Sequence, residues 1–313
     1  MRTRLRLFST IIVTLTVTAL SAASAASADG RSADLPVIFN SVPAVAASLA
    51  RPGGPPPGAN DWSCRSVTHP RPVILLHGTH ANMAVNWNTL SPLLKNNGYC
   101  VFALNYGGLL AGQIGGTGDI HTATADVAAF VDRVLTTTGA SETDLVGHSL
   151  GGTVAQYYVK FFDGAKKVHN VIGLAPTSHG STASGLDNWI KTALQLFPPL
   201  KAFITTHDPA ALQQLRGSAF LARLNSLPDT VPGVHYTTIV TRFDAVVTPY
   251  QSQFLTGDTA TNILLQDKCA NDYADHLAPA FDHVALQEVL NALDPATARR
   301  PHCTTPVWPV IGG

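Results

Sequence analysis

Gly147-His148-Ser149-Leu150-Gly151 is the segment of this sequence whose residue types and spacing point most directly to chemistry. A serine with glycines two positions before and after it fits the G-x-S-x-G pattern of a sharp turn between a strand and a helix. Side chains at both glycine positions would collide with the neighbouring strand and helix, so the turn needs glycine there. An apolar run at 144–146 precedes the turn and a helical pattern follows it. This context predicts that Ser149 is a nucleophile and not part of an ordinary glycine-rich turn.

A serine hydroxyl attacks well only when a histidine removes its proton and a carboxylate orients that histidine. The chain order that accompanies this kind of turn is serine, acid, histidine. Asp244 follows a predicted strand at 235–240 and would lie near the C-terminal end of that strand, so we predict that it is the acid. Asp258, in a glycine turn, and Asp267, at the end of the next predicted strand, are the alternatives.

The histidine is selected by position from twelve in the sequence. Only His276, His283 and His302 follow the last predicted strand. We predict that His283 is the base, because it directly precedes the last predicted helix and would then lie on the loop that faces Ser149. His276 is the alternative.

An oxyanion site is predicted from the apolar run that ends in His77-Gly78-Thr79. A continuous apolar run ending in glycine is typical of a strand buried on both faces of a parallel sheet. Its C-terminal end would lie near the serine turn. The backbone N–H groups of Thr79 and Leu150 are then expected to stabilise an oxyanion.

Short apolar runs alternate with helical patterns, which predicts a mostly parallel α/β sheet with helices on both faces. Strands are expected at 73–76, 99–104, 144–146, 168–174, 235–240 and 262–265, and helices at 87–96, 123–135, 152–161 and 284–293. Segment 180–229 is longer than a usual crossover and rich in apolar residues. We expect a helical cap insertion there, either a mobile lid or an ordinary pair of packing helices. In both cases it should line the substrate pocket, with Phe197, Phe203 and Phe220 among its apolar side chains.

The first residues have the pattern of a secretory signal peptide. Arg2, Arg4 and Arg6 are followed by an uncharged stretch at 7–20 and by the small residues Ala26-Ser27-Ala28. We predict a signal peptide at 1–28, a Pro/Gly/Ala-rich extension at 29–60 and a single α/β catalytic domain at 61–313, which implies a secreted, extracellular protein. An uncleaved membrane anchor is disfavoured, because alanine and serine interrupt the apolar run.

Secretion changes how the four cysteines are interpreted, since exported thiols tend to pair. Three pairings are possible. We favour Cys64 with Cys100 and Cys269 with Cys303, because each bridge joins neighbouring segments. The absence of C-x-x-C spacing disfavours a zinc site.

Composition excludes one class of partner. Twenty basic and twenty acidic residues give a formal net charge of zero, and charged residues make up only 13% of the chain. A nucleic-acid-binding protein usually concentrates positive charge, so no nucleic acid is expected. The partner is expected to be apolar or uncharged.

Taken together, these residues resemble the secreted triacylglycerol lipases of actinobacteria, the lipase class 2 branch of the α/β-hydrolase superfamily. The resemblance rests on Pro57-Gly58-Ala59-Asn60-Asp61-Trp62-Ser63-Cys64, His77-Gly78-Thr79, Gly147-His148-Ser149-Leu150-Gly151-Gly152, Thr241-Arg242-Phe243-Asp244 and Asp282-His283.

The resemblance implies an α/β-hydrolase fold and hydrolysis of acylglycerol esters by Ser149, Asp244 and His283, with Thr79 and Leu150 at the oxyanion. The triad mechanism requires no cofactor, and no metal is carried over because the sequence shows no convincing carboxylate cluster. A short-chain carboxylesterase, a polyester hydrolase or a phospholipase would use the same triad. An acyltransferase and a non-catalytic binding protein are the more distant alternatives.

Overall fold

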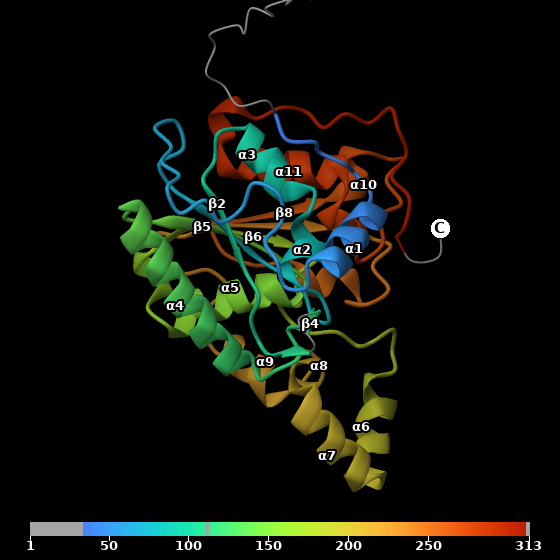
Figure 1. Ribbon diagram of the computed structural model, residues 1–313. Helices are drawn as coiled ribbons and strands as arrows, with labels where there is room; N and C mark the ends of the chain where they lie inside the picture. The colour runs from blue at the N-terminus through green and yellow to red at the C-terminus, as the bar shows by residue number, and fades with distance from the viewer. Residues whose placement is uncertain (1–33, 111–112, 311–313) are drawn as a thin grey trace, which may run out of the picture. The chain divides into compact units, whose positions relative to one another are not determined.

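Six parallel strands form the central sheet of the computed structural model, which describes residues 34–110 and 113–310 (Figure 1). The strand order is β2-β1-β5-β6-β7-β8. The strands are β1 (Val73–Leu76), β2 (Val101–Leu104), β5 (Thr143–His148), β6 (Val168–Leu174), β7 (His235–Val240) and β8 (Ala260–Leu264). Two short strands, β3 (Leu109–Leu110) and β4 (Ile114–Gly115), pair separately as an antiparallel hairpin. The predicted signal peptide at 1–28 lies outside the described residues.

Helices cover both faces of the sheet, as the sequence predicts. They are α1 (Ser41–Ala50), α2 (Met83–Trp87), α3 (Leu90–Asn96), α4 (Ile120–Thr138), α5 (Leu150–Phe161), α6 (Asp187–Leu196), α7 (Pro198–His207), α8 (Pro209–Gln213), α9 (Ala219–Leu224), α10 (Leu265–Lys268) and α11 (His283–Leu293). Helices α4 and α5 lie on one face, and α3 and α11 lie on the other (Figure 1).

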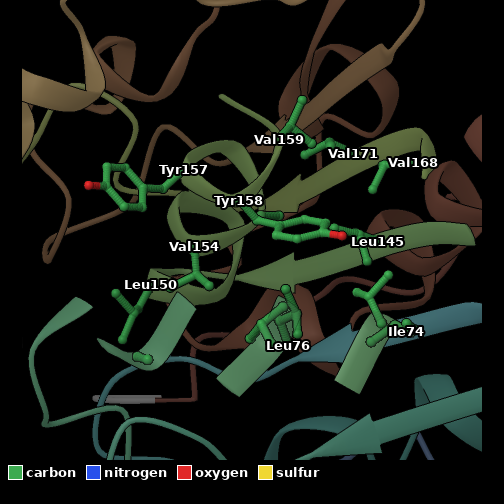
Figure 2. Packing of buried hydrophobic residues seen from close by; sticks show 14 of the residues in the cluster. Ile74, Leu76, Leu145, Leu150, Val154, Tyr157, Tyr158, Val159, Val168 and Val171 are labelled. Carbon is green, nitrogen blue, oxygen red and sulfur yellow. The ribbon is translucent and has the colours of Figure 1, made fainter. Parts of the chain in front are cut away.

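Alternation along the strands divides the core between the two faces. In β1, Ile74 and Leu76 belong to the cluster under α4 and α5, whereas Val73 and Leu75 belong to the cluster under α3 and α11. Figure 2 shows the first cluster, with Tyr158 of α5 lying over the sheet beside Leu145. Because every residue of β1 is fully buried, its apolar run is continuous instead of alternating.

Strand register places the loop after β1, where the oxyanion site is predicted, beside the serine turn. Leu76 of β1 lies opposite Gly147 of β5. The residues that follow each strand therefore leave the sheet at the same edge, as expected for neighbouring parallel strands.

The structure differs from the predicted elements at three helices. Helix α10 begins at Leu265, the last residue of the strand expected at 262–265. The expected helix at 87–96 is two helices, α2 and α3. Pro92 has no N–H with which to bond the carbonyl of residue 88, so a helix can start at Leu90 but cannot run through from α2. Helix α1 was not predicted, because the extension at 29–60 reads mainly as alanine, proline and glycine.

The insertion contains four helices. Helices α6 and α7 extend away from the sheet (Figure 1), and no residue of α7 is buried. Helices α8 and α9 pack closer to the domain, where Ala210, Leu221 and Leu224 join the core under α5.

Both predicted disulfides are present. Cys64 bridges to Cys100 and Cys269 bridges to Cys303. The first joins the approach to β1 with the start of β2, and the second joins the segment after β8 with the C-terminal tail. Within the described residues, no helix is both long and apolar enough to span a membrane.

Candidate active site

The turn between β5 and α5 has the geometry that its glycines predict. Ser149 adopts φ 53° and ψ −120°, a conformation that side-chain-bearing residues rarely occupy. A Cβ on Gly147 would lie 2.2 Å from the carbonyl carbon of Gly151. A Cβ on Gly151 would lie 2.0 Å from the carbonyl oxygen of Leu76. The predicted collisions with helix and strand are therefore confirmed, and the turn presents the Ser149 hydroxyl at the sheet edge.

A hydrogen-bonded chain of three side chains includes that hydroxyl. Nε2 of His276 lies 2.9 Å from Oγ of Ser149, and Nδ1 of His276 lies 2.7 Å from Oδ2 of Asp244. All three residues are buried. A proton on Nδ1 donates to Asp244, which leaves Nε2 free to accept the serine proton.

The loop after β7 fixes the orientation of Asp244. Its Oδ1 accepts hydrogen bonds from the N–H groups of Val246 and Val247, at 2.8 and 2.7 Å. Its Oδ2 also accepts from Nε2 of Gln253 at 3.0 Å. The alternatives do not reach this position, since Asp258 is exposed and Asp267 lies 3.7 Å from Arg242 on the surface.

The prediction that His283 faces Ser149 is wrong. His283 is the first residue of α11, and its Nε2 lies 3.0 Å from the carbonyl oxygen of His302 in the C-terminal tail. Asp282 caps this helix by accepting from the N–H groups of Val284 and Ala285, which holds His283 in the first turn. The chain passes Ser149 seven residues before the helix begins, so it is His276 that faces the serine.

A signal for His276 is present in the sequence. Asp275 precedes it, and Oδ1 of Asp275 accepts from the N–H groups of Leu277 and Ala278. Asp followed by a proline-containing segment is typical of a turn. That pattern favours a loop at 275–279, a better position for a catalytic base than a helix start.

Sequence reasoning missed a second buried histidine at the site. Nδ1 of His148 lies 3.0 Å from Oδ1 of Asn86, and its Nε2 lies 2.9 Å from the carbonyl oxygen of His276. Oδ1 of Asn86 also accepts from the N–H of Gly78 at 3.0 Å. The ring therefore lies between Asn86, which contacts the loop after β1, and the loop that carries His276. When neutral it has one N–H and donates to one of these two oxygens.

Burial determines the protonation of this histidine. Desolvation lowers the pKa of His148 to about 4, so the ring is neutral at neutral pH. Burial likewise lowers the pKa of His77, the last residue before Gly78, to about 4. The two histidines that flank the site are therefore uncharged structural residues, and they place no extra positive charge beside His276.

A cavity of about 550 Å³ opens onto Ser149 and His276. Thr79 lines it, and the Oγ1 of Thr79 accepts from Nε2 of Gln214 at 2.8 Å. The apolar lining residues are Val45, Ala81, Val85, Ala183, Ala211, Leu215, Val246, Val247, Leu277, Ala280, Phe281 and Val310. No Asp, Glu, Lys or Arg is among the described residues that line it.

The expected lining by large side chains of the insertion is only partly found. Ala183, Ala211 and Leu215 contribute to the wall. Phe197 and Phe203 lie on the α6–α7 arm with 61% and 62% of their surface exposed, whereas Phe220 is buried in the core beside Tyr157. The insertion therefore reaches the cavity through its small residues and α8, because the long helices point away from the sheet.

Residues 71–233, more than half of the chain, match the pattern of a family described as the alpha/beta hydrolase fold. This chain belongs to the α/β-hydrolase fold family. The triad order, the strand order and the serine turn described above agree with that membership.

Two curated relatives of this α/β hydrolase are named triacylglycerol lipases. One, from Pseudarthrobacter phenanthrenivorans, is 33% identical over 92 residues, 28% of this chain and 27% of the relative. The other, from Burkholderia plantarii, is 33% identical over 92 residues, 28% of this chain and 24% of the relative. The match thus spans about a quarter of the length of each relative.

Among solved structures, the chain is similar to lipase B from Aspergillus fumigatus. The TM-score is 0.59 at 18% identity, over 79% of this chain and 56% of that one. At this identity the likeness shows a shared fold.

Proposed function

We propose that this α/β hydrolase cleaves carboxylic esters through an acyl-serine intermediate. The observation that carries the proposal is the hydrogen-bonded chain from Asp244 through His276 to Ser149. The strained turn adds support, because backbone strain at a serine beside a histidine is a feature of nucleophile sites. The names of the two curated relatives support the same class of substrate.

The residues would act in two similar half-reactions. His276 takes the proton of Ser149 while the serine oxygen attacks the ester carbonyl, and Asp244 stabilises the resulting imidazolium. The N–H groups of Thr79 and Leu150 stabilise the oxyanion. His276 then protonates the departing alcohol, and water attacks the acyl-serine in the same way to release the acid.

The lining of the cavity favours uncharged esters with hydrocarbon chains. Its walls are mostly apolar, and Ser149 and His276 are among its polar lining residues. We therefore propose a lipase-like preference for acylglycerol esters. A phospholipase is less well supported, because no Lys or Arg among the described lining residues could pair with a phosphate. A short-chain carboxylesterase or a polyester hydrolase would use the same groups, and an acyltransferase would replace water with another alcohol.

We further propose that the protein is secreted, with 1–28 removed as a signal peptide. The two disulfides support an oxidising compartment. At a lipid–water interface, the exposed Trp189, Phe197 and Phe203 of the α6–α7 arm would contact the apolar phase. No cofactor is needed for these steps.

The decisive experiment combines labelling with turnover. A fluorophosphonate probe should label Ser149 in the parent protein and fail to label Ser149→Ala. The parent should hydrolyse p-nitrophenyl esters and emulsified triolein, and mixed-acceptor assays should give mainly free acid. Equal labelling of both proteins, or a parent that turns over no ester, would refute the proposal.

A further inference from the structure

Helix α1 lies against the cavity although it belongs to the extension predicted at 29–60. Ser41 and Val45 of α1 line the cavity that contains Ser149. Val45 keeps 47% of its surface exposed, so it has room for a larger side chain. The extension therefore contributes directly to the space in which a substrate would bind.

The position of α1 is fixed by buried contacts on its other residues. Ala44 is fully buried and packs with Ala280 and Phe281 of the segment that follows His276. Ser48 is also buried, and its hydroxyl accepts a hydrogen bond from Nδ2 of Asn82 at 2.9 Å. Ser48 in turn donates to Oε1 of Gln113 at 3.0 Å.

The segment before α1 is held to the domain as well. The backbone of Leu35 makes two hydrogen bonds with the side-chain amide of Asn96, at 2.9 and 2.8 Å. The hydroxyl of Thr89 donates to the carbonyl oxygen of Ile38 at 2.7 Å. With anchors before and within it, α1 forms a wall with a defined position.

The C-terminal tail completes the same wall. Val310 lines the cavity and packs against the cluster of Ala44, Ala280 and Phe281. The Cys269–Cys303 disulfide ties this tail to the segment after β8. The N-terminal extension and the C-terminal tail thus meet at Phe281.

We propose that α1 and Val310 form the wall that contacts the hydrocarbon chain of the ester, and that Val45 sets the longest chain bound with full affinity. The inference rests on the proposed function and deepens it. Burying one more methylene against an apolar wall changes affinity by about fourfold, so a wall residue changes selectivity steeply with chain length. Such a change is expected to leave the triad in place, because the hydrogen bonds described above for Ser149, Asp244 and His276 come from segments other than α1.

The test places tryptophan at two valines of the same helix. Val45→Trp narrows the cavity, whereas Val42→Trp is the matched control because Val42 is 71% exposed and does not line it. Ser41→Trp adds bulk at the second lining position, in case the indole at 45 turns to solvent. kcat/KM is measured for p-nitrophenyl esters with acyl chains from two to sixteen carbons and for alkyl acetates with alcohol chains of increasing length.

Val45→Trp or Ser41→Trp should lower kcat/KM for the longest chains by about tenfold or more, with less than about twofold change for the shortest esters. Val42→Trp should match the parent at every length. If the dependence of kcat/KM on chain length changes in only one of the two ester series, that series identifies whether the acyl chain or the alcohol chain lies along α1.

If the chain-length profiles of Val45→Trp and Ser41→Trp both match the parent in both ester series, the inference is overturned. The proposed function is then left intact. An equal loss at every chain length has the same two consequences. A parent that hydrolyses none of these esters and is not labelled at Ser149 would instead refute the proposed function and the inference together.

Discussion

Two regions of the molecule differ in how they are held in place. One is the C-terminal end of the central strands, called the sheet edge below, which holds Ser149. The other is the α6–α7 arm of the insertion. At the sheet edge the side chains of Ser149, His148 and His276 are almost fully buried, and each has a named hydrogen-bond partner. On the arm, Trp189 and Phe203 expose 75% and 62% of their surface. Position at the C-terminal end of the strands is thus set by many short polar contacts. The arm is held at its base, where Asp187 pairs with Arg216 at 3.3 Å and Lys191 donates to the carbonyl oxygen of Arg216 at 2.6 Å. Substitutions at the edge should change the chemistry, whereas those on the arm should change only contact with aggregated substrate.

The strongest test of that contrast removes the attacking hydroxyl. Ser149→Ala should lower kcat for ester hydrolysis by roughly 10⁴-fold or more, by analogy with other serine triads. The smaller side chain fits the turn, so the thermal midpoint should stay within a few degrees of the parent value. Turnover per mole of purified protein and circular dichroism measure the two quantities. Activity close to that of the parent would mean that another residue is the nucleophile.

Substitutions of His276 and His283 test which histidine is the catalytic base. His276→Ala should lose roughly 10³-fold or more in kcat, because proton transfer from Ser149 is lost. His283→Ala should stay within about threefold, since its ring contacts the C-terminal tail and not the serine. Steady-state kinetics on a short soluble ester measures both. The reverse ranking would contradict the geometry of the site.

Because His148 is buried and neutral, we expect it to make the free energy of unfolding depend on pH. The folded-state pKa of His148 is about 4, below the ordinary value of 6.5. Between these values the unfolded chain binds a proton that the folded chain does not, so this group makes stability rise with pH and fall on acidification from about 6.5 to 4. The stabilisation is fully present above 6.5.

Replacing that ring should flatten the dependence. In His148→Asn, the slope of the unfolding free energy between pH 4 and 6.5 should be smaller than in the parent by up to about 1.4 kcal/mol per pH unit. Urea unfolding at several pH values gives both slopes. Because the comparison is between two proteins that share every other titrating group, identical slopes would show that His148 does not titrate differently on folding.

The smallest effect is expected on the arm. Phe197→Ser with Phe203→Ser should change kcat/KM for a soluble short-chain ester by less than about twofold, because neither side chain lines the cavity. Their removal should lower the rate on emulsified triolein if the arm contacts the lipid phase. Loss of activity on the soluble ester, with folding intact, would show that the arm also positions the site.

Phe220→Ser is expected to lower stability, since Phe220 packs on Tyr157 in the core.

The sequence was most informative where local pattern and burial coincide. The runs at 168–174 and 235–240 are rich in β-branched residues and match β6 and β7 residue for residue. The glycines of the serine turn could be interpreted from sterics alone. Asp244 was found because a catalytic acid belongs near a strand end, and the structure brings it within reach of His276 and Ser149.

Other features depend on distances that local pattern does not encode. His283 was preferred over His276 because a helix start is easier to locate than the path of an irregular loop. His148 was missed because its partners, Asn86 and the carbonyl of His276, lie 62 and 128 residues away in sequence. Helix α1 was missed because its alanine-rich sequence carries little amphipathic signal, and its burial depends on contacts with Phe281 far along the chain.

The wall formed by α1 and Val310 has a consequence for how such proteins diversify. Both parts lie outside residues 71–233, the segment that carries the family pattern. Two homologues with the same serine turn can therefore acquire different substrate ranges through insertions, deletions or exchanges in their flanking segments alone. Selection on those segments leaves the strands and the serine turn untouched, so a phylogeny built from the shared core would group enzymes whose natural substrates differ.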